Sequence, residues 1–210
     1  DLEGDGAFIC QNSWGDNFGE NGFFYISYYD TNIGTHNVVY TDIENTDNYD
    51  HIYQSDLCGW VGQLGYNKDS IYGANVFTAE GNETLKAASF YATGKDSQYE
   101  LYVVRQFEDE TSLEKMIPVA SGKLGNAGYY TVDFNQGIEV DAGERYAVVL
   151  YIITPGSVHP MAIEYAADEA TENVDLDDGE SYISANGSKW VSVDTVEKSN
   201  LCIKAFSDNR

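Results

Sequence analysis

Residues 146–153 read YAVVLYII, an uninterrupted run of eight apolar residues. Such a run is typical of a central strand that is covered on both faces, whereas a strand with one face in water alternates apolar and polar residues. We therefore expect residues 146–153 to form a strand in the middle of a sheet, with packed layers on both sides of it.

Shorter strand-like segments lie on both sides of this run in the sequence. They are rich in Tyr, Val, Thr and Ile, which favour strands, and glycines and other turn residues separate them. Residues 129–134 alternate, with Tyr130, Val132 and Phe134 on one face, and Asn186-Gly187 is a strong hairpin signal. The expected strands are 74–79, 85–93, 99–106, 129–134, 146–153, 161–166, 181–185, 189–193 and 201–206.

Helical periodicity is almost absent from the chain. Only residues 111–116 and 166–173 are expected to form one helical turn each. Many short strands with turn signals between them predict a mainly β protein, built as an antiparallel sandwich or barrel. Residues 30–48 are polar and rich in Asn, Thr and Asp, which predicts a linker ahead of this β region.

The chain is strongly acidic. Its 210 residues include 35 acidic and 11 basic side chains, which gives a formal net charge of −24 and a sequence pI near 4.1. Nucleic acid and anionic membranes repel such a chain, so we expect no nucleic-acid partner. No apolar run approaches the roughly 18 residues of a membrane-spanning helix, so we expect no membrane span. The charge suits solubility and calcium binding, although a solvated acidic face without a ligand is commoner.

The three cysteines are too few and too widely spaced for a zinc motif or a disulfide scaffold. Cys10 lies in the apolar run 7–10 and is expected to be a small buried residue. A disulfide between Cys58 and Cys202 is an alternative to free thiols.

Residues 11–24 read QNSWGDNFGENGFF. This segment resembles the asparagine segment of papain-like cysteine peptidases, whose pattern is N-S-W-G-x-x-W/F-G-E-x-G-Y/F. The resemblance covers roughly residues 6–28, the last part of that peptidase domain, and the alternative is a glycine-rich aromatic hairpin with no catalytic role. Nine positions fit the pattern: Asn12, Ser13, Trp14, Gly15, Phe18, Gly19, Glu20, Gly22 and Phe23.

The resemblance implies that Asn12 orients the catalytic histidine and that Trp14 shields the hydrogen bond between them. In such enzymes the cysteine acts as a thiolate, and an imidazolium beside it lowers the pKa of the thiol. A side-chain amide oxygen that accepts the remaining imidazole N–H fixes the ring without adding a charge.

The family's nucleophilic cysteine and catalytic histidine lie well upstream of this asparagine. Cys10 is too close to Asn12 to be that nucleophile, and His36, His51 and His159 all follow Asn12. We therefore expect the 210-residue chain to be inactive by itself. The parent protein is expected to be a cysteine endopeptidase that acts on protein or peptide substrates, with the missing N-terminal peptidase half as a partner of this chain.

A second set of segments is 39–42, 49–54, 59–62, 74–79, 181–184, Trp190 and 202–206. These segments resemble the lectin-like domain appended to bacterial surface cysteine peptidases, over nearly all of residues 38–207. The two resemblances together imply C-terminal strands of a papain-like domain in residues 1–34 and a linker with an entry strand in 35–56. They imply a lectin-like antiparallel β-sandwich of jelly-roll type in 57–210, and an extracellular or bacterial cell-surface location.

The lectin-like resemblance also implies a structural Ca²⁺, whereas catalysis is expected to need no cofactor. Loops 80–83 and 175–180 carry clustered carboxylates that suit calcium, although each also fits an ordinary acidic turn. Trp60, Trp190 and the many tyrosines offer faces for the sugar rings of a cell-wall glycan, or pack in the core. A non-enzymatic carbohydrate-binding module and a structural spacer stay open as alternative functions.

Overall fold

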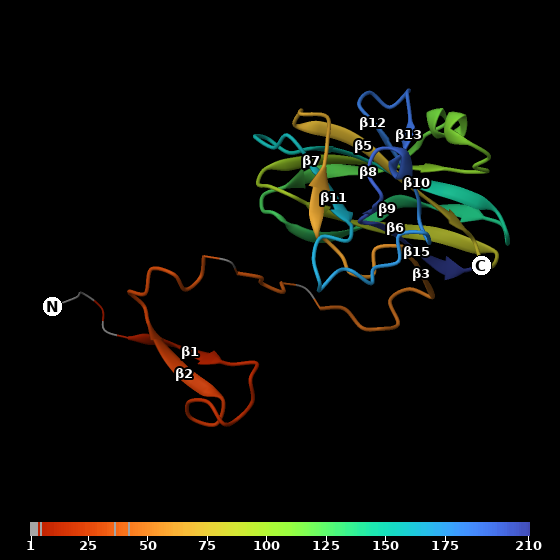
Figure 1. Ribbon diagram of the computed structural model, residues 1–210. Coiled ribbons are helices and arrows are strands. Elements are labelled where there is room, and N and C mark those ends of the chain that lie inside the picture. The colour runs from red at the N-terminus through yellow and green to blue at the C-terminus, as the bar shows by residue number, and fades with distance from the viewer. Residues whose placement is uncertain (1–3, 5, 36, 42) are drawn as a thin grey trace. The chain divides into compact units, whose positions relative to one another are not determined.

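The computed structural model describes residues 4, 6–35, 37–41 and 43–210, so His36 and Asp42 lie outside the described residues. The chain divides into two compact units, unit 1 (Asp1–Asn45) and unit 2 (Thr46–Arg210). Each unit has its own sheets, a two-stranded one in unit 1 and the larger ones in unit 2 (Figure 1).

Unit 1 is built on one antiparallel hairpin. β1 (Ala7–Gln11) pairs with β2 (Phe23–Ser27), and residues 12–22 form the loop between them. The loop needs glycine at Gly19, where φ is +67° and a Cβ atom would lie 2.1 Å from the carbonyl oxygen of Phe23. The glycines of the sequence motif therefore serve a tight loop that returns the chain beside β1.

Unit 2 contains a six-stranded antiparallel sheet in the order β13-β12-β5-β10-β7-β8. β10 (Arg145–Ile153) lies between β5 and β7, as its apolar sequence predicts. Val148 and Leu150 point to the inner face of the sheet, while Ala147 and Val149 join a second apolar cluster on the outer face. The prediction that this strand is covered on both sides is confirmed. The other strands of the sheet are β5 (Ser70–Thr78), β7 (Ser97–Val104), β8 (Ile117–Leu124), β12 (Glu180–Ser184) and β13 (Val191–Ser192).

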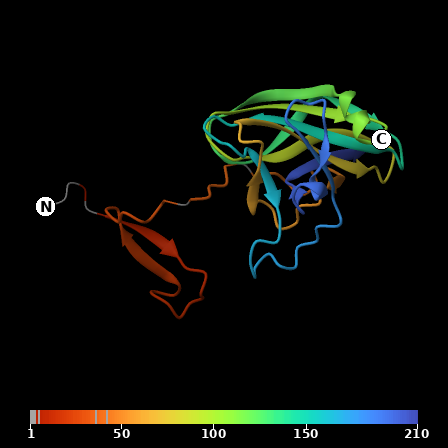
Figure 2. The same ribbon diagram turned by 45° about the horizontal axis from the view of Figure 1, so that its top comes forward.

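A four-stranded sheet in the order β3-β15-β6-β9 faces the six-stranded sheet (Figures 1 and 2). Leu85 and Phe90 from this layer are fully buried against Leu101 and Leu150 of the other layer in one inner cluster. A three-stranded sheet, β14-β11-β4, adds Met161 to the same core. Their bounds are β3 (His51–Tyr53), β4 (Gly62–Leu64), β6 (Glu83–Ala92), β9 (Gly128–Val140), β11 (Met161–Glu164), β14 (Asn200–Leu201) and β15 (Ile203–Asn209).

Helical structure is limited to two 3₁₀ turns within the described residues, η1 (Glu110–Glu114) and η2 (Val193–Thr195). η1 lies where a helical turn was expected, and Asp109 caps it. The helical turn expected at residues 166–173 is wrong, because these residues form non-helical turns. Their backbone N–H groups bond instead to the side chains of Asp168 and Thr171, which stabilise a local turn.

The sequence missed β4 and β8 as strands, whereas β3 lies within residues 35–56, where an entry strand was expected. β8 contains Pro118 and Gly122, which weaken a strand signal, but β8 is an edge strand, where proline is tolerated. All three cysteines are free thiols, so the alternative of a Cys58–Cys202 disulfide is wrong, and Cys10 is half-buried rather than buried. The predicted mainly β fold with an antiparallel sandwich is confirmed.

Within the part of the chain that the structure describes, no helix has the length and apolar character needed to cross a membrane.

Candidate functional site

Asn12 follows β1 directly, at the start of the loop of unit 1. Its backbone N–H donates to the carbonyl oxygen of Gly22 at 2.9 Å, which extends the hairpin ladder by one bond. Its side-chain Oδ1 accepts a hydrogen bond from the backbone N–H of Trp14 at 2.7 Å, so the side chain is held in a local turn. An amide oxygen has two lone pairs, and Oδ1 of Asn12 therefore keeps acceptor capacity for a second donor.

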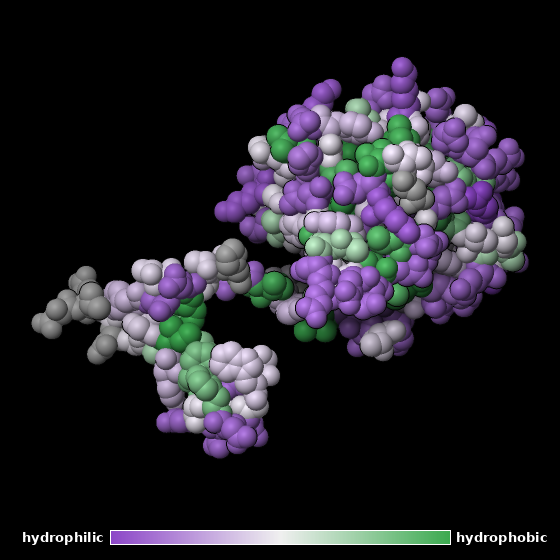
Figure 3. All heavy atoms as spheres, in the orientation of Figure 1, coloured by the Kyte–Doolittle hydropathy of each residue, from purple (hydrophilic) through white to green (hydrophobic). Residues whose placement is uncertain are grey.

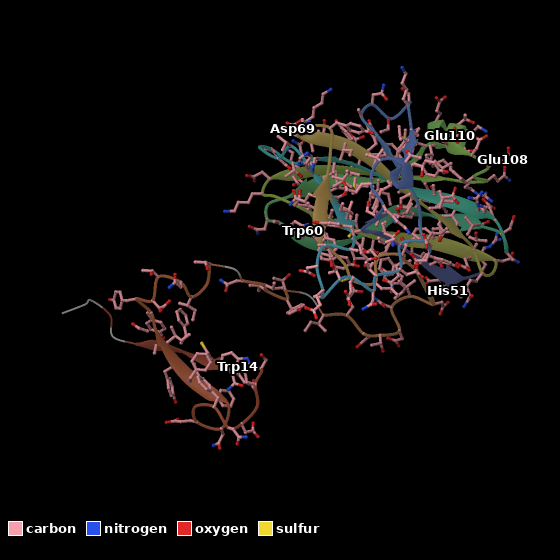
Figure 4. The ribbon with its side chains drawn as sticks, in the orientation of Figure 1. Trp14, His51, Trp60, Asp69, Glu108 and Glu110 are labelled. Carbon is pink, nitrogen blue, oxygen red and sulfur yellow. The ribbon has the colours of Figure 1, made fainter. Side chains whose placement is uncertain are left out.

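Trp14 is 76% exposed, and its ring meets Phe18 edge to face with centroids 5.2 Å apart. Phe8 and Ile9 of β1 are also exposed, and Figure 3 shows a band of apolar residues along the visible face of unit 1. Figure 4 labels Trp14 on this hairpin.

The described residues of unit 1 include no histidine. His51 and His159 belong to unit 2, and His36 lies outside the described residues. The orienting role of Asn12 and the shielding role of Trp14 therefore stay predictions.

A group of oxygen atoms converges on Asn200 in unit 2. We call it the Asn200 cluster: Ser55, Glu164, Asp175, Asp178 and Asn200. Nδ2 of Asn200 lies 2.7 Å from the Ser55 carbonyl, 2.9 Å from the Asp175 carbonyl, 3.1 Å from Asp178 Oδ1 and 3.2 Å from Glu164 Oε1. An amide nitrogen has only two hydrogens, so the oxygen acceptors outnumber the donors there.

The electrostatics of this cluster favour a positive charge. Glu164 is 1% exposed, and burial raises its pKa, although the backbone N–H groups of Cys58 and Gly59 that bond its Oε2 act in the opposite direction. Burial also raises the pKa of Asp178, and the nearby charge of Asp175 adds to this. Packed carboxylates of this kind are unfavourable together unless a cation compensates them.

Two more buried polar side chains lie at the Asn200 cluster, the hydroxyl of Ser55 and the carboxylate of Asp56. The hydroxyl of Ser55 is buried without a hydrogen-bond partner among the described residues. Asp56 is 1% exposed and pairs with Lys204, whose Nζ lies 3.1 Å from Oδ1. Burial raises the pKa of Asp56 more than Lys204 lowers it. The region around the cluster thus holds more buried oxygen than its protein donors satisfy.

The two loops predicted for calcium have different outcomes. In loop 80–83 the carboxylate of Glu83 is buried and accepts hydrogen bonds from Tyr53 at 2.7 Å, Ser207 at 2.5 Å and the Gly81 N–H at 2.8 Å, so it is not free to bind an ion. Loop 175–180 contributes the carbonyl of Asp175 and the carboxylate of Asp178 to the Asn200 cluster.

The sequence did not predict the other members of the Asn200 cluster. Ser55, Glu164 and Asn200 are far apart in the chain, and Ser55 contributes a backbone carbonyl, which leaves no sequence signal. The one available signal was Glu164, a carboxylate at the end of the buried strand β11. Over the described residues, no three His, Cys, Asp or Glu side chains gather as a metal site, but calcium also accepts carbonyl and amide oxygens.

The two tryptophans proposed as sugar platforms have different surroundings. Trp190 is half-buried, and its ring packs against Tyr72 beside the outer apolar cluster. Trp60 (Figure 4) is 36% exposed. The centroid of its ring lies 5.7 Å from that of Tyr91, which in turn lies 5.0 Å from that of Tyr129. Trp190 therefore packs within the domain, as the alternative to sugar binding predicted, whereas one part of the Trp60 ring is open to solvent.

The fold has relatives among solved structures. A variant of the clostridial cysteine protease Cwp84, solved after propeptide cleavage, matches with a TM-score of 0.79 and 24% identity, over 97% of this chain and 52% of that chain. "The crystal structure of the cysteine protease and lectin-like domains of Cwp84, a surface layer associated protein of Clostridium difficile" matches with a TM-score of 0.74 and 22% identity, over 97% and 46%. The chain thus spans about half the length of these proteins, and at this identity the likeness concerns the fold.

No curated protein matches the chain. The model of the family described as "Lectin like domain" matches residues 52–207, which is most of the chain and nearly all of unit 2. This chain therefore belongs to the lectin-like domain family.

Proposed function

We propose that this chain is the C-terminal part of a papain-like cysteine endopeptidase of the bacterial cell surface, with unit 2 as its accessory lectin-like module. In this proposal unit 1 supplies the last strands of the peptidase domain, corresponding to residues 1–34. The observation that carries it is the state of Asn12, which the hairpin holds in place with acceptor capacity left on Oδ1.

The mechanism assigns one positioning residue and one shielding residue to this chain. Asn12 Oδ1 would accept the N–H of an imidazole from the N-terminal part of the peptidase and hold the ring toward the cysteine thiolate. Trp14 would lie over that hydrogen bond and exclude water, which strengthens it. The 76% exposure of Trp14 and the exposed apolar side chains of β1 support this, because they leave a surface for a partner to cover.

The Asn200 cluster fits the structural calcium that the family resemblance implies. The carboxylates of Glu164 and Asp178 and the carbonyls of Ser55 and Asp175, which surround Nδ2 of Asn200, are hard oxygen ligands of the kind that calcium prefers. The ion would supply positive charge to buried carboxylates and would tie together loops that are far apart in the sequence. It would take no part in peptide hydrolysis.

A second candidate function is a binding module or spacer that acts without peptidase chemistry. The observation in its favour is that the sheets of unit 2 enclose their own core, so the module needs no peptidase domain to bury its apolar residues. This alternative differs from the first in one respect: Asn12 would have no effect on any activity of the protein.

The test is the activity of the complete gene product, to which this proposal assigns the rest of the peptidase domain. We expect it to hydrolyse a protein substrate and to react with an epoxide inhibitor of papain-like enzymes, while the 210-residue chain does neither. Asn12→Ala should lower kcat by about 10²-fold, because a misplaced imidazole costs that much. Asn17→Ala, the same substitution at a variable position of the motif, should leave kcat unchanged. A complete product without peptidase activity would favour the binding module, whereas an active product with equal kcat in both variants would remove the positioning role of Asn12.

A further inference from the structure

Two rows of side chains cross the outer face of the six-stranded sheet. They alternate along the strands with Leu101, Leu150 and other residues of the inner cluster, so they point away from the core. One row joins directly paired residues of β12, β5, β10, β7 and β8: Ser184, Tyr72, Tyr151, Glu100 and Ser121. The next row joins Ser70, Ile153, Gln98 and Lys123.

A hollow of about 250 Å³ lies on these rows, over β10, β7 and β8. We call it the outer hollow. Its lining residues are Gln98, Tyr99, Glu100, Ser121, Gly122, Lys123, Tyr151 and Ile153. The side chain of Tyr99 packs against the inner cluster, so Tyr151 supplies the aromatic ring on the outer face, beside polar and charged groups. Its volume is slightly below that of pockets for drug-sized ligands, so it suits one or two rings of a longer molecule.

The rest of the outer face is closed by the chain itself. The apolar cluster on β5, β7 and β10 includes Ala74, Val104 and Val149, and Phe107 and Leu113 from the segment that follows β7 are buried with it. The hollow lies on the part of the face that carries polar residues and Tyr151. The open part is thus not an uncovered piece of core.

Tyr151 is held in a fixed orientation. Its ring stacks on Tyr72, with centroids 4.2 Å apart and planes at 22°, and Tyr72 in turn contacts Trp190. β5, which carries Tyr72, and β7, which carries Glu100, lie on opposite sides of β10. Tyr72 therefore supports Tyr151 from the side away from the outer hollow, and the other side of the ring is left toward it.

The polar groups of the outer hollow can both donate and accept hydrogen bonds. Gln98 offers an amide, Ser121 a hydroxyl and Lys123 an ammonium group, and the Glu100 carboxylate is oriented by a hydrogen bond from the Tyr102 hydroxyl. One acid and one base line the hollow, so it carries no net charge, whereas the whole chain carries −24. An anionic ligand would meet the repulsion of the chain, and a neutral one would not.

We propose that the outer hollow binds a neutral oligosaccharide, with one sugar ring lying on Tyr151 and its hydroxyls bonding Gln98, Glu100 and Lys123. A flat ring with an apolar face and a rim of hydroxyls matches an aromatic ring bordered by donors and acceptors. This inference rests on the proposed function, because it names the ligand class of the accessory lectin-like module.

The test is a titration of the ¹⁵N-labelled 210-residue chain, followed by NMR, with four neutral tetrasaccharides: cellotetraose, maltotetraose, mannotetraose and tetra-N-acetylchitotetraose. Each is raised to roughly 10 mM, because a shallow site binds with a Kd of about 1 mM. We expect at least one to shift amide signals of residues 98–100, 121–123 and 151. Tetragalacturonate, a matched anionic probe, should leave these signals in place.

Substitutions in the outer hollow then test whether the saccharide binds there. Tyr151→Ala should raise Kd by about tenfold and Gln98→Ala by about threefold, whereas Tyr151→Phe should bind like the original chain. Tyr129→Ala removes an exposed tyrosine on the other sheet and should leave Kd unchanged. If Tyr151→Ala loses its folded spectrum, the exposed Gln98 still decides the assignment.

Three results would overturn the inference: no binding of any neutral probe, equal binding of tetragalacturonate, or shifts centred on Trp60 and Tyr129. None of these results would contradict the proposed function, which is tested separately by the effect of Asn12→Ala on peptide hydrolysis. Conversely, loss of the peptidase proposal would leave a measured saccharide site in unit 2.

Discussion

The two units of the chain differ in how they treat their apolar residues. Unit 2 buries side chains from facing sheets, and Phe90, Leu101 and Ile203 have no exposed surface. Unit 1 leaves Ile9 69% exposed and Trp14 76% exposed on a hairpin of two strands. The unit that carries the strongest catalytic motif thus has the least core of its own, whereas the unit with a complete core carries no peptidase motif.

This difference indicates what each unit is built for. A two-stranded hairpin is at best marginally stable in water, because it has one layer and nothing to bury its faces. A sandwich of two sheets closes its core without a partner. We infer that the sequence of unit 1 encodes one part of a larger domain, and that of unit 2 encodes a whole one.

The largest expected contrast is in hydrogen exchange of the isolated chain. Amides of β10 should exchange only on global unfolding, which costs about 5–15 kcal/mol in typical domains. Amides of β1 and β2 should exchange at least about 10³-fold faster, since each 1.4 kcal/mol is tenfold. NMR measures the exchange rates of individual amides in a dilute, monomeric sample of the chain. Slow exchange at Cys10 and Phe24, whose N–H groups lie in the ladder between the two strands, would mean that the hairpin folds alone and that its dependence on a partner is misjudged.

Truncation of apolar side chains should separate the units next. Leu150 is 1% exposed in the inner cluster, and Leu150→Ala should lower the free energy of unfolding by about 2–5 kcal/mol through lost burial and a cavity. Ile9→Ala in unit 1 should change it by less than about 0.5 kcal/mol, as for exposed sites. Urea unfolding followed by far-UV circular dichroism measures both. Equal losses would contradict the contrast between a closed and an open unit.

Calcium should sharpen the contrast further, because only unit 2 contains the Asn200 cluster. At about 100 times Kd, calcium should stabilise the folded chain by about 2.7 kcal/mol, and a thermal scan against chelator measures the rise in Tm. Glu164→Gln should abolish most of that rise, while Glu110→Gln, an exposed acidic residue outside the cluster, should keep it. Magnesium serves as the control ion. Identical midpoints with calcium and with chelator would remove the ion from unit 2.

The sequence predicted the parts of the fold that depend on local pattern. The apolar run 146–153 became the central strand β10, and Asn186-Gly187 lies in the turn between β12 and β13, where Gly187 has a φ of +75°. The alternation of residues 129–134 is also confirmed by the burial of β9. Patterns of this kind report on one strand and its two faces, so they can be read without knowing the neighbours.

The sequence could not predict what depends on distant pairs. Tyr72 and Tyr151 meet only because β5 and β10 pair in one particular register, and Asn200 meets Glu164 because β14 pairs with β11. Neither pairing has a local signal. The loop at 175–180 was recognised as acidic, but which of its groups point inward depends on Asn200.

The smallest predicted effect tests how unit 2 keeps its outer face covered. The segment that carries Phe107 and Leu113 is anchored by Glu144, whose carboxylate accepts two hydrogen bonds from Arg105, at 2.9 and 2.7 Å. Glu144→Gln should lower the free energy of unfolding at neutral pH by about 2 kcal/mol, as for hydrogen bonds to a charged group. Glu114→Gln, at an exposed position near the same segment, should cost less than about 0.5 kcal/mol.

The destabilisation caused by Glu144→Gln should depend on pH in a defined direction. The hydrogen bond from Arg105 lowers the pKa of Glu144 below its ordinary value of 4.5. A carboxyl group whose pKa is lowered by folding contributes stability above its ordinary pKa and loses it as the pH falls through the folded value. The difference between the original chain and Glu144→Gln should therefore be constant at neutral pH and shrink below pH 4.5. If Glu144→Gln destabilises the chain equally in acid and at neutral pH, Glu144 acts through its shape and packing and not through its charge. Another interaction would then have to hold the segment with Phe107 and Leu113 over the outer apolar cluster.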